Sequence, residues 1–367
     1  MKSKVLCVIG TRPEAIKMAP VILALKSSPN IDCRVLATAQ HRHILDQVLD
    51  VFDIQPDIDL NIMRANQALT TLTARLLLEL DDVLLAEKPD LVLAQGDTTT
   101  VMSISLACFY HHIAFGHVEA GLRTWDISNP FPEEMNRVVT GKLTKWHFAP
   151  TESSRHNLLK EGVNDNEIIV TGNTVIDALK SVSNTPQEIG VKLDDSKRLI
   201  LVTAHRRENF GNPIKQICQA VRTIAENNED VQVLYPVHPN PNIQTVANEI
   251  LGNHPRIELC SPLEYLPFVG AMQRAYLILS DSGGVQEEAP ALGKPVLVLR
   301  TETERPEAVD AGAVKLVGHS YNAIIKETQN LLDDSGLYEQ MAQGISPYGD
   351  GHAAARIVQV IKEQFNK

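Results

Sequence analysis

Short, uninterrupted apolar runs alternate with helix-like segments along most of the chain, and this alternation limits the possible folds more than any other feature. Such runs, when rich in β-branched residues, are typical of strands buried on both faces of a parallel sheet. The first half contains them at residues 4–9, 34–39, 91–94, 114–118, 146–148 and 168–170. The second half contains them at residues 199–203, 231–237, 277–280, 296–299 and 314–317. The pattern predicts two parallel α/β sheets, each covered by helices on both faces.

A polar segment over residues 181–197, which contains Pro186 and Gly190, separates the two sets of strands. Linkers between domains are commonly polar and rich in proline and glycine. We therefore predict two Rossmann-like domains, over residues 1–180 and 181–352. An amphipathic pattern at 353–365 predicts a last helix, and we expect residues 353–367 to pack back on the first domain. Because open parallel sheets bind ligands beyond the carboxyl ends of their strands, two facing domains would form a cleft.

The composition narrows the classes of partner. The formal net charge is −11, so a nucleic-acid partner is not expected. The five cysteines include no CxxC pair, which favours reduced thiols in a cytoplasmic protein. No apolar stretch approaches the ~18 residues that a membrane helix needs. The first apolar run leads directly into GTRPE, so we interpret it as a strand rather than a signal peptide.

The first predicted strand ends in GTRPEAIK, residues 10–17. Gly10 permits a tight turn, and Pro13 suits the first position of a helix. A helix N-terminus attracts anions, and Arg12 and Lys17 add two cations there. The alternative is an ordinary helix start with solvated charges, but its position after the first strand favours a ligand site.

Three later motifs place carboxylates in the same domain. Asp97 lies in QGDTTT and Glu119 in HVEAGLR, each just beyond a predicted strand, and Glu133 lies in PEEMNR. Carboxylates that converge on one cleft suit proton abstraction and delivery. Asp97 could instead be only a helix cap, and Glu133 only a solvated residue of a first helical turn.

The second domain carries groups that suit phosphate binding. His205 lies beside two arginines in TAHRREN, residues 203–209, at a strand-to-helix turn. Arg305 lies in a later strand-end loop. The stretch SDSGGVQEEA opens a helix after an apolar strand. Its Ser282, Gly283 and Gly284 are typical of an anion nest, and Glu288 lies one turn later, where a carboxylate could accept hydrogen bonds from ribose.

Several other classes of enzyme lack their signatures. No G-x-G-x-x-G follows a predicted strand, which disfavours a nicotinamide dehydrogenase. The twelve histidines show no spacing of the H-E-x-x-H kind, so we expect no metal. No G-x-S-x-G elbow is present for a serine hydrolase.

Taken together, the motifs resemble those of one family, the bacterial non-hydrolysing UDP-N-acetylglucosamine (UDP-GlcNAc) 2-epimerases. They include GTRPEAIK, TAQHR, GDTTT, GHVEAGLRT, PEEMNR, TGNTVIDAL, HRREN, EYLPF, SDSGGVQEEA and TERPEAV, in this order, over about residues 4–361. The resemblance implies the glycosyltransferase-B architecture, in which two Rossmann-like domains face each other across a cleft. It also implies interconversion of UDP-GlcNAc and UDP-N-acetylmannosamine (UDP-ManNAc) for surface polysaccharides, homodimers, and often activation by a second UDP-GlcNAc. No cofactor or metal is implied.

The resemblance also assigns roles to individual residues. Arg12 and Lys17 would lie near the nucleotide sugar, Asp97, Glu119 and Glu133 would be acid–base groups, and His205 would approach the diphosphate. The remaining substrate contacts would be Phe268 at the uracil and Ser282, Gly283, Gly284, Glu288 and Arg305 at the phosphates and ribose. The candidates for a regulatory site are Gln40, Gln47, Arg64, Arg207 and His238. Leu263 departs from the family by replacing a glutamine found in some members.

The expected reaction follows from the substrate. The C2–H of the sugar is weakly acidic, but loss of UDP from C1 would acidify it. We therefore expect elimination of UDP to 2-acetamidoglucal, followed by re-addition with the proton delivered to the opposite face. The main alternative is a UDP-sugar glycosyltransferase of the same fold. A hydrolysing epimerase and a non-catalytic nucleotide-sugar sensor are further alternatives.

Overall fold

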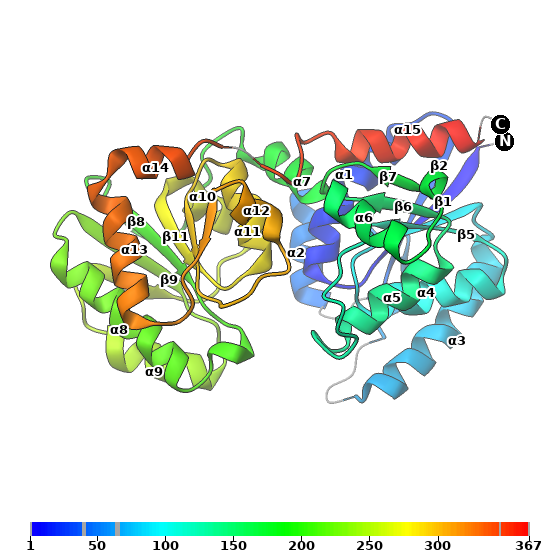
Figure 1. Ribbon diagram of the computed structural model, residues 1–367. Helices are drawn as coiled ribbons and strands as arrows, with labels where there is room; N and C mark the ends of the chain where they lie inside the picture. The colour runs from blue at the N-terminus through cyan, green and yellow to red at the C-terminus, as the bar shows by residue number, and fades with distance from the viewer. Residues whose placement is uncertain (1, 39–41, 63–66, 345, 366–367) are drawn as a thin grey trace. The chain divides into compact units, whose positions relative to one another are not determined.

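The computed structural model describes residues 2–38, 42–62, 67–344 and 346–365. The chain divides into two compact units, one formed by residues 1–178 with 348–367 and the other by residues 179–347. Each unit contains one parallel sheet with helices on its two faces, which confirms the predicted fold class (Figure 1). Within the described residues, no helix is long and apolar enough to cross a membrane.

The first unit is built on a seven-stranded sheet in the order β3-β2-β1-β4-β5-β6-β7. Its strands are β1 (Ser3–Ile9), β2 (Ile31–Ala37), β3 (Ile58–Asp59), β4 (Leu91–Gln95), β5 (Ala114–Val118), β6 (Trp146–Ala149) and β7 (Ile168–Val170). Its helices are α1 (Arg12–Lys26), α2 (Arg42–Val51), α3 (Leu69–Glu87), α4 (Thr99–Tyr110), α5 (Glu133–Leu143), α6 (Glu152–Lys160), α7 (Thr174–Ser183, which runs on into the second unit) and α15 (Ala353–Phe365), with the 3-10 turn η1 (Asp165–Glu167). α1 packs against α2 and α15, whereas α4 packs against α3 and α5 (Figure 1).

The second unit repeats this topology with a six-stranded sheet in the order β10-β9-β8-β11-β12-β13. Its strands are β8 (Arg198–Thr203), β9 (Val231–Pro236), β10 (Ile257–Cys260), β11 (Ala275–Ser280), β12 (Val296–Val298) and β13 (Val314–Leu316). Its helices are α8 (Asn212–Asn227), α9 (Pro241–Leu251), α10 (Tyr265–Arg274), α11 (Gly283–Ala291), α12 (Pro306–Asp310), α13 (Tyr321–Asp333) and α14 (Ser335–Met341), with the 3-10 turn η2 (Arg207–Asn209).

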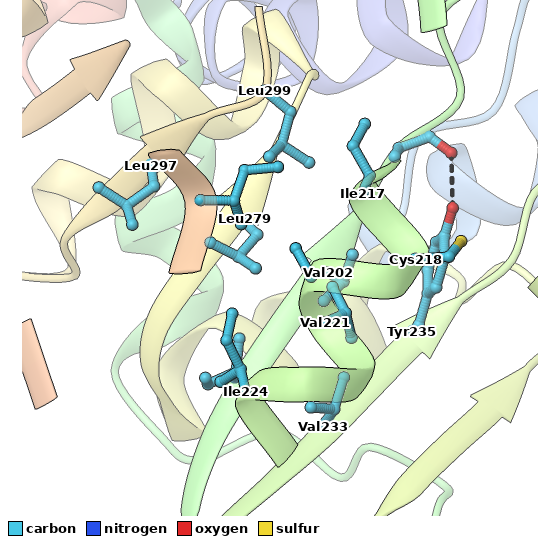
Figure 2. Close-up of a cluster of buried hydrophobic side chains, with 14 of the residues drawn as sticks. Val202, Ile217, Cys218, Val221, Ile224, Val233, Tyr235, Leu279, Leu297 and Leu299 are labelled. Atoms are coloured by element: carbon cyan, nitrogen blue, oxygen red, sulfur yellow. Dashed lines mark hydrogen bonds between the residues drawn. The ribbon is translucent and has the colours of Figure 1, made fainter. Parts of the chain in front are cut away.

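The apolar runs of the second unit form a closely packed core. In Figure 2, Ile217, Val221 and Ile224 of α8 lie against side chains of the sheet, and all three are fully or almost fully buried. Tyr235 of β9 is also fully buried, and its hydroxyl donates a 2.9 Å hydrogen bond to the carbonyl of Ala204. That bond satisfies the polar end of a core tyrosine and ties the segment after β8 to the core.

In each sheet the strand order reverses beside the first strand, and polar motifs follow the strands at this point. In the first sheet the reversal lies between β1 and β4, which lead into Gly10 and Gly96. In the second it lies between β8 and β11, which lead into Ala204 and Asp281. Ligands of open α/β sheets bind at such a switch point, so the topology selects these four connections as candidate sites.

Candidate functional site

Glu119 is the best-anchored carboxylate of the first unit. It follows β5 with a φ of 64° and is only 9% exposed. Its Oε1 accepts hydrogen bonds from Lys17 Nζ and, at 2.7 Å, from Asn173 Nδ2, while its Oε2 accepts one from Gln95 Nε2. Three donors, one of them a cation, stabilise the ionised carboxylate and fix its position.

Asp97 lies beside Glu119 in a different electrostatic setting. It follows β4 and Gly96, and its Oδ2 lies 3.3 Å from Arg137 Nη1. Burial raises the pKa of Asp97 to about 6, the charges of Glu119 and Glu133 add to the rise, and Arg137 opposes it. A carboxyl group with this pKa can both accept and return a proton near neutral pH.

The two neighbouring glutamates at the start of α5 have different environments. Glu134 is buried, its Oε1 accepts from the backbone N–H of Thr124 (3.0 Å) and Trp125 (3.1 Å), and its Oε2 pairs with Arg137 Nε at 2.8 Å. Glu133 is half-buried and has no hydrogen bond or ion pair with the described residues, yet its charge reaches Asp97. Glu134 therefore supports the loop, whereas the carboxylate of Glu133 makes no such contact with the described residues.

The turn after β1 presents a cation and hides a carboxylate. Arg12, in the first turn of α1, is exposed. Glu14 is 3% exposed and accepts from the N–H groups of Gly10 (2.5 Å) and Thr11 (2.8 Å) and from the hydroxyl of Thr98 (2.6 Å). Burial raises the pKa of Glu14 to about 7 despite these hydrogen bonds. Glu14 thus joins the turn after β1 to the turn that carries Asp97.

In the second unit, the N-terminus of α11 lies against an arginine. A Cβ atom on Gly283 would come within 2.5 Å of Arg305 Nη1, so the glycine lets the guanidinium lie directly against the helix start. Arg305 Nε donates to Glu287 Oε1 at 2.7 Å, which holds the guanidinium in place. Free N–H groups of a helix start with a guanidinium beside them attract a phosphate. Ser282 precedes this start as the N-cap, and a Cβ on Gly284 would meet only ordinary contacts.

Three arginines surround one carboxylate close to this helix start. Glu304 contacts Arg305, Arg300 (2.8 Å) and Arg206 (3.4 Å). Burial opposes ionisation of Glu304, yet the three guanidinium groups hold its pKa well below the usual range. The second unit therefore gathers three arginines at the ends of β8 and β12, where Glu208, Glu287 and Glu304 balance their charges.

His205 follows β8 and lies on a buried aspartate. Its Nδ1 is 3.2 Å from Oδ1 of Asp281, and its ring stacks on that of His238 with centroids 5.9 Å apart.

The two remaining substrate candidates of the second unit lie on helices. Glu288 of α11 is buried, and its Oε1 lies 3.4 Å from the hydroxyl of Tyr265. Phe268 is half-buried on α10.

The comparisons with known proteins agree over nearly the whole chain. The family model for UDP-N-acetylglucosamine 2-epimerase matches residues 23–362. The chain belongs to the UDP-N-acetylglucosamine 2-epimerase family. The UDP-N-acetylglucosamine 2-epimerase of Yersinia pestis is 56% identical to this chain and that of Salmonella typhimurium 54%, each over 98% of both chains. A crystal structure of the Neisseria meningitidis UDP-GlcNAc 2-epimerase bound to UDP-GlcNAc has 49% identity and a TM-score of 0.91, covering 98% of this chain and 100% of that one.

Membership in the 2-epimerase family confirms the predicted resemblance and the enzyme class, because an epimerase is an isomerase. Family membership therefore favours an epimerase over a UDP-sugar glycosyltransferase or a non-catalytic nucleotide-sugar sensor. Within the described residues, no group of three or more His, Cys, Asp or Glu side chains is arranged to hold a metal ion.

The regulatory candidates expected from the 2-epimerase resemblance are only partly described. Gln40 and Arg64 lie outside the described residues, as does the side chain of Arg207, whose backbone is in η2. Gln47 is half-buried on α2. His238 is exposed after β9, where it contacts His205. Leu263 is half-buried just before α10.

Four residues that support the candidate site of this epimerase were not identified from the sequence. Gln95 and Asn173 hold Glu119, Glu14 joins two turns, and Asp281 contacts His205. Thr11 and Glu14 fit the T-x-x-E capping pattern, which could have drawn attention to Glu14. Asn173 lies far from Glu119 in the sequence, and no local pattern connects them.

Proposed function

We propose that the chain interconverts UDP-GlcNAc and UDP-ManNAc by reversible epimerisation at C2, without hydrolysis, through 2-acetamidoglucal. The observation that carries this proposal is the pair formed by Asp97 and Glu119, two neighbouring carboxylates in unlike environments. One is held by three donors, and the other has a pKa raised to about 6. A carboxyl group that can exchange a proton, beside a carboxylate that is held in place, suits a reaction in which a proton leaves C2 while positive charge develops on the sugar ring. The Neisseria relative, solved with UDP-GlcNAc bound, supports the choice of substrate.

The proposed elimination conserves atoms and electrons. The C1–O bond breaks, its electron pair leaves with the β-phosphate oxygen of UDP, and the C2 proton passes to a base as the C1=C2 double bond forms. In the return step, the UDP oxygen adds to C1 and a proton is delivered to C2 on the opposite face. The sequence of steps consumes no oxidant, reductant or water.

The two units supply different parts of this chemistry. In the first unit, Asp97 and Glu133 are proposed to exchange protons with the sugar, because neither is fixed by several donors. Glu119 is proposed to remain ionised and to stabilise positive charge that develops on the sugar ring as UDP departs. In the second unit, the N-terminus of α11 with Arg305 and His205 is proposed to stabilise the departing diphosphate. Glu288 is proposed to hold the ribose hydroxyls and Phe268 the uracil ring.

Incubation of the purified chain with UDP-GlcNAc alone in D₂O tests the function. We expect UDP-ManNAc to form without an acceptor and deuterium to appear at C2 of both nucleotide sugars, as followed by NMR. A requirement for an acceptor would identify a glycosyltransferase. Release of free ManNAc and UDP would identify a hydrolysing epimerase, and binding without turnover would identify a sensor.

We also propose that a second UDP-GlcNAc molecule acts as an activator. Initial rates should then rise sigmoidally with substrate concentration.

We also propose that the chain is a homodimer that pairs through α3 and α4. These neighbouring helices expose Leu78 (71%), Leu85 (54%), Phe109 (59%) and Tyr110 (66%). Large apolar side chains exposed on two helices that pack together indicate a protein interface. Leu78→Asp with Phe109→Asp should convert a dimer into a monomer in sedimentation velocity. Leu23→Asp, on α1, is the control and should leave the dimer intact; a monomeric wild-type chain would refute the proposal.

A further inference from the structure

Asp281 is a buried carboxylate at the switch point of the second sheet to which the proposed reaction assigns no task. It directly follows β11 and is fully buried. Its Oδ2 accepts three hydrogen bonds from the connection after β8: from the N–H of His205 (2.8 Å), the N–H of Arg206 (2.8 Å) and Asn209 Nδ2 (2.9 Å). One oxygen atom thus fixes the backbone that carries His205.

The other oxygen of Asp281 faces the imidazole ring. Oδ1 lies 3.2 Å from His205 Nδ1, and it is buried without a hydrogen-bond partner among the described residues. A small rotation of the ring would satisfy this acceptor. Because a carboxylate can only accept, it favours a proton on Nδ1 and leaves Nε2 on the opposite edge of the ring. The side chain of His205 is 42% exposed, so the ring runs from a buried anion toward solvent.

The segment around His205 is held on further sides. The Asp281 N–H donates to the carbonyl of Thr203 at 3.0 Å, and the Thr203 and Ser280 hydroxyls are 2.7 Å apart. The Tyr235 hydroxyl holds the carbonyl of Ala204. The His238 ring covers one face of the His205 ring. The backbone that carries His205 is therefore held by several hydrogen bonds, and the ring itself contacts Asp281 and His238.

We propose that Asp281 is a positioning residue for His205, orienting its ring so that Nδ1 faces the buried carboxylate and Nε2 faces the diphosphate of the nucleotide. This inference rests on the proposed function, because it gives His205 a departing diphosphate to stabilise. To donate to the diphosphate, Nε2 must carry a proton as well, and the negative charges of Asp281 and of the bound diphosphate on opposite edges of the ring favour this doubly protonated, positively charged form.

Asp281→Asn should change the orientation of the His205 ring proton while keeping the hydrogen bonds that hold the backbone. The asparagine oxygen can still accept the three N–H groups of the connection after β8, whereas its NH₂ group would donate to Nδ1 and place the ring proton on Nε2. A buried aspartate beside a histidine in the serine proteases behaves in this way: its asparagine variant keeps the geometry but reverses the tautomer. We expect kcat to fall by about 10²-fold or more, with a much smaller change in KM for UDP-GlcNAc.

A double-mutant cycle and a spectroscopic measurement decide between positioning and simple support. If Asp281 acts through His205, Asp281→Asn should cost less than about threefold in kcat in a His205→Gln background. In ¹⁵N spectra of the substrate-free protein at alkaline pH, where the ring is neutral, the His205 nitrogens should exchange their protonated and unprotonated shifts in Asp281→Asn. Thr203→Val, which removes a neighbouring buried hydrogen bond, is the matched control and should lower Tm without changing those shifts.

Two results would overturn the proposal: equal losses of kcat in the two backgrounds, or unchanged ¹⁵N shifts in Asp281→Asn. Wild-type chain that does not epimerise UDP-GlcNAc would instead refute the proposed function. The tautomer measurement needs no turnover, so the two failures can be told apart.

Discussion

Asp97→Asn should lower kcat for the epimerisation of UDP-GlcNAc by about 10²-fold or more. The amide has nearly the same shape as the carboxylate, but it cannot take a proton from C2. The charge of Arg137 should not be left without a partner, because its Nε pairs with Glu134 at 2.8 Å. The loss should therefore appear in kcat while Tm stays close to that of the wild type.

The pH dependence of the wild type should follow from the same residue. Burial raises the pKa of Asp97 from 3.8 to about 6. If Asp97 acts as the base, it must be ionised, so kcat should fall as the pH drops through about 6, and Asp97→Asn should lose this dependence. Asp165→Asn, at an exposed aspartate paired with Arg155, is the control and should match the wild type. Near-normal turnover of Asp97→Asn, with a retained acidic limb, would remove Asp97 from the chemistry.

Apolar runs without alternation predicted the strands buried inside the two sheets, because such strands need no polar face. The sequence did not predict β3 and β10, which lie at the corresponding edges of the two sheets. β3 has two residues, too few to produce a pattern, and β10 has Glu258 exposed in a run of four. Edge position alone does not explain these omissions, because β7 and β13 also lie at edges and were predicted from their apolar runs.

In the candidate site, too, residues at strand ends could be predicted from the sequence, whereas contacts between distant segments could not. Gly96 and Asp97 come directly after β4, and Gly283 and Gly284 open α11, which two residues separate from β11, so the strand–turn–helix order placed them at the carboxyl ends of the sheets. Which carboxylate is fixed and which can exchange a proton depends on Asn173, Gln95 and Arg137. These residues come from other segments and meet Glu119 or Asp97 only in the folded chain, so the sequence left the roles of the two carboxylates open.

Lys17→Met should destabilise the first unit strongly, because it removes a cation that is paired with the buried carboxylate of Glu119. The two side chains are 10% and 6% exposed. Removing one partner of a buried ion pair typically costs about 3–5 kcal/mol of unfolding free energy. We also expect kcat to fall by about 10²-fold or more, since loss of this cation makes it easier for Glu119 to take up a proton or to move. Chemical denaturation and the epimerisation assay measure the two effects.

A double variant separates the charge balance of this pair from its chemical role. Lys17→Met with Glu119→Gln removes both charges, so it should regain much of the lost unfolding free energy. Its kcat should stay low, because the anion proposed to face the sugar is absent. Lys4→Met is the matched control: Lys4 pairs with Glu87 at 3.3 Å in a partly exposed position, where a pair is worth about 0–1 kcal/mol. A double variant no more stable than Lys17→Met would show that charge balance is not what the lysine supplies, and one with wild-type kcat would exclude Glu119 from the reaction.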